Sequence, residues 1–85
     1  MRLWLQGTTM KERDQKRLKK LGAHLKKLRK NRGLSIRQLA ALCDVDYAKI
    51  SKIESTGVNM NVTTLMELAD GLEVTPKDLL DFEFS

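Results

Sequence analysis

Leucines recur at helical spacing through the first third of the chain. Leu18, Leu21, Leu25 and Leu28 are separated by three or four residues, which places them on one face of a helix. Thr9 to Glu12 has the spacing of a capping box, and Gly33 is a residue type that commonly ends helices. We therefore predict a helix from Thr9 to the region of Gly33, preceded by a short arm.

Four shorter helices are predicted further along the chain. Ser35 to Gln38 forms a second capping box, Asp46 and Asn61 are suitable N-caps, and Thr75 to Asp78 has Pro at the first helical position. The apolar positions of the last two helices are Val62, Leu65, Leu68, Ala69, Leu72, Leu79, Leu80 and Phe82. We identify no convincing strand, so the predicted fold class is all-α with five helices.

The second and third predicted helices are joined by a very short turn within residues 35–55. Asp44 to Asp46 leaves room only for a steep crossing, as in a helix-turn-helix. We expect a small Ala40 at the crossing and a left-handed backbone at Asp44. Small, polar or basic side chains remain outward on the second of these helices: Tyr47, Ala48, Lys49, Ser51 and Lys52. Such a surface suits entry into a groove.

Basic side chains are concentrated in the first part of the chain. Residues 1–52 hold 15 basic and 4 acidic side chains, whereas residues 53–85 hold one basic and 7 acidic side chains. Eleven of the basic residues lie between Lys11 and Arg32. A cationic face attracts polyanions, and nucleic acid is the first candidate. The alternative is a solubilising helix face that binds nothing.

Composition narrows the class of protein further. A chain of 85 residues fits one small domain without a large enclosed substrate pocket. The single cysteine, Cys43, excludes an internal disulfide and fits a core position in a reduced cytoplasmic protein. His24 has no partner at metal-ligand spacing, and no apolar run approaches the ~20 residues of a membrane span. We expect no enzyme activity, metal, cofactor or membrane association.

Four segments in order carry a resemblance to a known family. These segments are LRKNRGLS, QLA, ISKIE and LADGLEVTPKDLL, between Leu28 and Leu80. Over Leu21 to Phe82 the chain resembles the Cro/repressor-type helix-turn-helix family, also called the xenobiotic-response-element family. The resemblance implies a lambda-repressor-like domain of five helices over residues 21–85. Residues 1–20 are then an N-terminal arm and helix extension.

The resemblance implies sequence-specific DNA binding as a homodimer, in transcription regulation and without catalysis. Family members place the second motif helix in the major groove, which assigns base contacts to Tyr47, Ala48, Lys49, Ser51 and Lys52. Arg37 is expected at the phosphate backbone, as are Thr56, Asn59 and Asn61 in the following loop. In the family the Arg at position 29 pairs with the Glu at position 54, so Arg29 and Glu54 are expected to form a structural ion pair.

The chain departs from the family pattern at several positions. Ile36 stands where a phosphate-contacting Gln is usual, Asp44 replaces the turn Gly, and Met60 replaces the usual Pro. The Gly expected after the recognition helix is late, at Gly57. None of these departures breaks the fold.

Two other functions use the same fold. One is the antitoxin of a toxin–antitoxin pair, in which a toxin is the main partner and DNA binding is autoregulation. The other is a restriction-modification controller protein. The dimer is expected to form through the fourth and fifth helices and the C-terminal tail.

Overall fold

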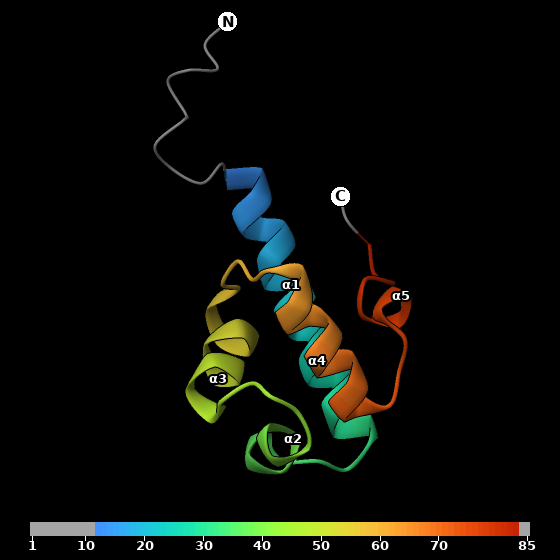
Figure 1. Cartoon of the computed structure of the whole chain (residues 1–85). Coiled ribbons are helices and arrows are strands. Elements are labelled where there is room, and N and C mark those ends of the chain that lie inside the picture. The colour runs from blue at the N-terminus through green and yellow to red at the C-terminus, as the bar shows by residue number, and fades with distance from the viewer. Residues whose placement is uncertain (1–11, 84–85) are drawn as a thin grey trace, which may run out of the picture.

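The computed structural model of the chain describes residues 12–83, which form five helices and no strand. The helices are α1 (Glu12–Asn31), α2 (Ile36–Leu42), α3 (Tyr47–Thr56), α4 (Val62–Leu72) and α5 (Pro76–Leu79), as Figure 1 shows. The predicted all-α fold of five helices is confirmed. Residues 12–20 continue α1 without a break as the N-terminal helical extension. The predicted arm and the predicted helix start at Thr9 lie outside the described residues.

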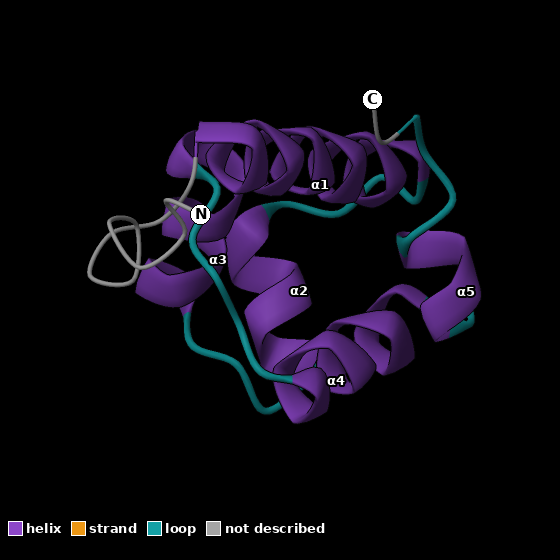
Figure 2. Ribbon diagram, turned by 90° about the horizontal axis from the view of Figure 1, so that it is seen from above, coloured by secondary structure: helices purple, strands orange, loops and turns teal. Residues whose placement is uncertain are grey.

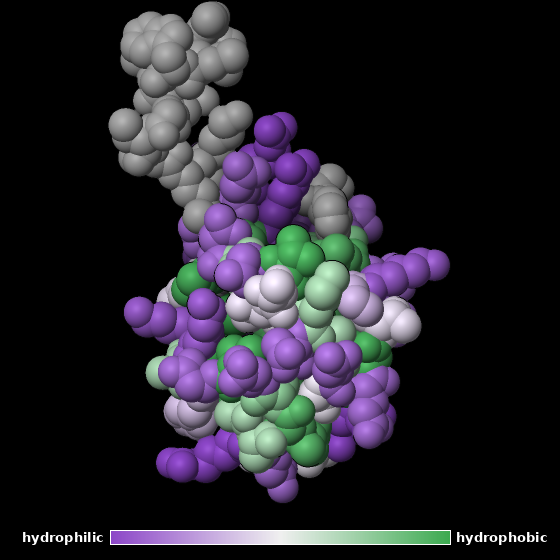
Figure 3. Space-filling view, in the orientation of Figure 1, coloured by the Kyte–Doolittle hydropathy of each residue, from purple (hydrophilic) through white to green (hydrophobic). Residues whose placement is uncertain are grey.

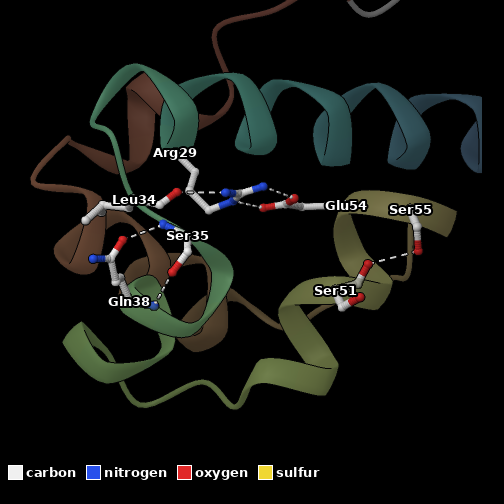
Figure 4. Close-up of polar contacts among 7 residues, drawn as sticks. All are labelled: Arg29, Leu34, Ser35, Gln38, Ser51, Glu54 and Ser55. Atoms are coloured by element: carbon white, nitrogen blue, oxygen red, sulfur yellow. Dashed lines mark hydrogen bonds and ion pairs between the residues drawn. The ribbon is translucent and has the colours of Figure 1, made fainter.

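Local capping fixes where the helices begin. The Ser35 hydroxyl accepts from the Gln38 amide at 3.0 Å, and the Gln38 side chain accepts from the Ser35 amide at 2.7 Å, as drawn in Figure 4. Asp46 caps α3 by accepting from the amide of Lys49 at 3.2 Å. Asn61 caps α4, and a second capping box opens α5. These satisfied amides hold the start of each helix in place.

One apolar core joins the five helices. Seven large side chains are fully buried: Leu25, Leu39, Ile50, Ile53, Leu68, Leu72 and Leu79. Seen from above in Figure 2, α1 and α4 lie on opposite sides of the molecule, with α3 toward one end and α5 at the other. The helix-turn-helix pair α2–α3 is therefore held by α1 on one side and by α4 on the other.

The backbones of α1 and α3 meet without intervening side chains. A Cβ atom on Gly22 would lie 2.1 Å from the carbonyl oxygen of Ile53. Gly57 caps α3 with a left-handed backbone at φ +73°, and a Cβ there would lie 2.5 Å from the amide nitrogen of Lys19. Any larger residue at either glycine pushes the two helices apart. Gly57 thus caps α3 directly after its last residue, Thr56.

The α1 extension supports the end of α3. The Gln15 side-chain amide donates to the carbonyl oxygen of Thr56 at 2.9 Å. Thr56 is the last residue of α3, and its carbonyl has no partner within the helix. Residues 12–20 therefore contribute to the placement of α3 although they lie before the helix-turn-helix segment.

The expected left-handed backbone at Asp44 is wrong. Among the described residues, the only non-glycine residue with positive φ is Glu73, at φ 59° after α4. The α2–α3 turn is instead built from extended backbone at Cys43 and Asp46. The Asp44 amide donates to the Glu67 carboxylate on α4 at 2.9 Å, which fixes the turn without a left-handed residue.

Two of the apolar positions named for the last two helices face solvent rather than the core. Val62 is 64% exposed and Leu80 is 43% exposed, whereas Leu79 beside it is fully buried. Val62 is the first residue of α4, and Leu80 caps the short α5, so each lies at a helix end. In the single chain, neither side chain is part of the buried core. With Met66, which is 49% exposed, they leave an apolar face on α4 and α5.

Candidate nucleic-acid interface

The outward face of α3 presents a stripe of small and basic side chains. Ile50 and Ile53 anchor the inner side of the helix and are 0% and 1% exposed. Opposite them lie four residues with the spacing i, i+3, i+4 and i+7, which share one helical face: Ala48, Ser51, Lys52 and Ser55. Ser51 is half-buried and the other three are exposed. None of the four belongs to the buried core.

Ser55 was not among the residues predicted from the sequence. Its hydroxyl donates to the carbonyl oxygen of Ser51 at 2.9 Å (Figure 4), which turns the side chain along the helix. It stands one turn beyond Ser51 and three residues beyond Lys52 on the outward face. Continuing the 3.6-residue period past Lys52 would have identified it.

Tyr47 and Lys49 lie on the two edges of this face. Tyr47 begins α3 and is 47% exposed, and its hydroxyl has no hydrogen-bond partner within residues 12–83. Lys49 is exposed and borders a shallow hollow that is also lined by Asp44, Asp46 and Thr64. The five predicted base-contact residues are therefore brought together on one helix, with Ser51 the least accessible.

The four predicted phosphate contacts fall into two groups at opposite ends of α3. Arg37 is exposed near the start of α2, and its Cζ lies 5.2 Å from the ring centroid of Tyr47. The Thr56 hydroxyl donates to the Lys52 carbonyl at 2.9 Å, so its proton is used within the helix. The Asn61 side-chain oxygen is used as the α4 cap. Asn59 is exposed and lines a hollow beside the α1 extension.

Arg29 and Glu54 meet in the interior beside α3. Arg29 donates to both carboxylate oxygens of Glu54, at 2.7 and 2.9 Å, and to the carbonyl oxygen of Leu34 at 2.7 Å (Figure 4). The side chains of the pair are only 8% and 5% exposed. The hydrogen bond to Glu54 raises the pKa of Arg29 above its ordinary value. This bidentate contact links α1, α3 and the residue before the α2 cap.

Other candidate chemistry is sparse in the described part of the chain. Residues 12–83 contain no group of three metal-ligating side chains, and no helix there is long and apolar enough to cross a membrane. The Cys43 thiol donates to the Leu39 carbonyl at 3.3 Å, and burial raises the pKa of Cys43. His24 contacts the carbonyl oxygen of Asp78 through Nε2 at 2.8 Å and thereby joins α1 to α5.

The geometry of α2 and α3 agrees with the comparison with known families. Residues 20–82 match the helix-turn-helix domain. The chain belongs to this family. A solved structure similar to this helix-turn-helix protein is that of the restriction-modification controller protein C.AhdI from Aeromonas hydrophila. The two chains are 32% identical with a TM-score of 0.70, and the match covers 73% of this chain and 94% of the other. No curated protein matches this helix-turn-helix protein.

Proposed function

We propose that this helix-turn-helix protein is a sequence-specific DNA-binding transcriptional regulator that places α3 in the major groove. The observation that carries the proposal is the outward face of α3. That face is formed by Ala48, Ser51, Lys52 and Ser55, which contribute nothing to the buried core. A helix whose outward side chains are small or basic fits between the phosphate backbones and reaches base edges.

Residue roles follow from position on this face. Lys49 and Lys52 donate to guanine O6 and N7, the Ala48 methyl contacts a thymine methyl, and the Tyr47 and Ser51 hydroxyls form hydrogen bonds at the groove edge. Arg37, Asn59 and Asn61 contact phosphates on either side of α3, and the Thr56 hydroxyl joins them by turning away from the Lys52 carbonyl. Because Arg37 is the charged member of that set, its removal should flatten the salt dependence of binding by about one unit.

A homodimer is the second part of the proposal. Val62, Met66 and Leu80 leave exposed apolar area beside a shallow apolar groove lined in part by Leu65 and Leu21. In Figure 3 hydrophobic surface lies over the start of α4, and hydrophilic side chains cover much of the rest of this helix. A second copy of the chain is the natural occupant, because two helix-turn-helix units related by a twofold axis read two half-sites. The interface is then formed by α4, α5 and the C-terminal tail.

The proposal also covers catalysis, cellular location and the division of the chain. It acts in the cytoplasm by binding DNA rather than by catalysis, which agrees with its membership of a DNA-binding class. Residues 21–85 are its DNA-binding domain, and residues 1–20 are an appended arm and helix extension.

Restriction-modification control is a second candidate function for the same interface. The observation that favours it is the 32% identity to a restriction-modification controller protein over most of both chains. In that case the genes beside the operator encode a nuclease and a methyltransferase. The candidate is distinguished from a general regulator by the neighbouring genes.

Selection of bound sequences from random double-stranded DNA tests the proposal. We expect a recurrent half-site that appears twice with twofold symmetry. Lys52→Ala should lose this preference. Lys30→Ala, at an exposed basic residue of α1 outside both α3 and the proposed dimer interface, should keep it. Recovery of unrelated sequences by the intact protein would refute sequence-specific binding. Sedimentation that shows only monomer, both free and on the selected DNA, would refute the dimer.

A further inference from the structure

Arg37 and Tyr47 form a contact that bridges the two helices of the helix-turn-helix. Arg37 is the second residue of α2 and Tyr47 is the first residue of α3. The guanidinium carbon lies 5.2 Å from the centroid of the tyrosine ring, which is within cation–π range. The contact therefore brings the starts of both helices to one surface.

Neither side chain has a competing polar partner in the described residues. Arg37 forms no ion pair with an acidic side chain there, although Asp44 and Asp46 lie in the adjoining turn. The Tyr47 hydroxyl has no hydrogen-bond partner within the same residues. The contact with the ring of Tyr47 uses no hydrogen-bond acceptor, so the N–H groups of the guanidinium stay available to another acceptor.

We propose that Arg37 is a positioning residue that sets the base preference of Tyr47, in addition to contacting phosphate. This inference rests on the proposed function, in which Tyr47 reaches a base edge. An exposed tyrosine at the start of a helix has more than one open rotamer. Arg37 restricts the ring, because α2 itself is fixed by the capping box of Ser35 and Gln38.

Restriction of the ring acts on specificity rather than on affinity alone. At the correct base, Tyr47 makes its contact. Binding then loses little conformational entropy, because the ring is already ordered in the free protein. At a wrong base the contact is not made, so the ordered ring brings no gain. Arg37 therefore widens the difference between correct and wrong bases. The ratio of the affinities for the correct and the wrong operator changes about two- to fivefold for an exposed cation–π contact, and about 30-fold for a desolvated one.

The contact is first tested in the free protein by nuclear magnetic resonance. The chain contains a single tyrosine, so its ring resonances are assigned without ambiguity. We expect the Arg37 Cδ protons to be shifted upfield by the ring in the wild-type protein, and the shift to disappear in Tyr47→Leu. Arg37 Cδ protons at the same position in both proteins would show that the stack is absent and would overturn the proposal.

The effect on specificity is tested with a panel of operators that differ by one base pair each. Affinities are measured for the wild type, Arg37→Lys, Tyr47→Leu and the double variant. We expect Tyr47→Leu to lose discrimination at one or two base pairs of each half-site. Arg37→Lys keeps the charge for the phosphate and so keeps affinity for the panel as a whole. At those same base pairs, Arg37→Lys should reduce the affinity ratio between the correct and the altered operator at least about twofold. The double variant should show no further loss of this ratio beyond that of Tyr47→Leu.

The outcomes separate this inference from the proposed function. If Arg37→Lys changes affinity equally for every operator, and its effect adds to that of Tyr47→Leu, Arg37 is a phosphate contact only and the inference is wrong. Sequence-specific binding would stand in that case. If the wild-type protein binds every member of the panel equally, the proposed function fails and the inference fails with it.

Discussion

Replacing either member of the buried Arg29–Glu54 pair leaves a charge in the interior without its partner. We consider Arg29→Met and Glu54→Leu, which keep much of the side-chain volume and remove one charge each. In wild type Arg29 forms three hydrogen bonds of 2.7 to 2.9 Å, two to Glu54 and one to Leu34. At 8% and 5% exposure, water reaches the pair only slightly.

The expected cost of each single substitution is about 3–5 kcal/mol, as for other broken buried pairs. A domain of 85 residues has a total stability of about 4–13 kcal/mol, so each variant is close to unfolding. The melting temperature should fall by about 12 °C or more. The double variant leaves only the Leu34 carbonyl unpaired, which costs about 1–3 kcal/mol. The sum of the single costs is therefore well above the cost of the double variant.

Urea and thermal unfolding followed by circular dichroism measure these free energies. Arg32→Met is the matched control, because Arg32 pairs with Glu73 at the surface, where the side chains are 43% and 70% exposed. We expect it to cost less than about 1 kcal/mol. Single costs below about 1 kcal/mol that add in the double variant of Arg29 and Glu54 would refute the reasoning and make Arg29 available to DNA.

Four further outcomes follow from the site and its support. Lys52→Ala should lose about 1–3 kcal/mol of binding to the selected operator by fluorescence anisotropy, whereas Lys30→Ala on α1 should lose much less; equal losses would contradict the role of α3. Val62→Asp should weaken the dimer at least about tenfold by sedimentation, with unchanged helix content, because an acid is favourable at the start of α4. Gly57→Ala should destabilise the fold by more than about 1 kcal/mol in urea, because the residue has φ +73° and its added Cβ meets backbone. Burial raises the pKa of Cys43, so its alkylation by iodoacetamide at pH 7.5 should be slower than that of glutathione; an equal rate would contradict this reasoning.

The helices themselves could be predicted from the sequence because their signals are local. The capping box of Ser35 and Gln38 is formed by residues three apart in the chain. The capping box that opens α5 has the same spacing. The left-handed residue at the end of α4 could not be predicted in this way. Glu73 adopts φ 59° because the chain must turn so that the amide of Val74 reaches the Ala69 carbonyl at 3.0 Å. No residue preference indicates that conformation at a glutamate.

The candidate site was predictable where it depends on one helix and unpredictable where it depends on two. The outward position of Lys52 follows from the period of α3 alone. The stack of Arg37 on Tyr47 depends on the crossing of α2 and α3, which no spacing in the sequence specifies. Likewise, the amide of Asp44 is held by Glu67 from α4, so its backbone conformation was decided by a residue 23 positions away.

The separation between the outward face of α3 and the core has a consequence for how such a protein diverges. Substitutions at exposed positions such as Ala48 and Ser55 generally change stability by no more than about 0.5 kcal/mol. The caps at Asp46 and Gly57 and the anchors Ile50 and Ile53 keep the helix in place whatever stands on the other side. A duplicated copy can therefore drift toward a new operator by changes on one helix face while it remains folded at every step.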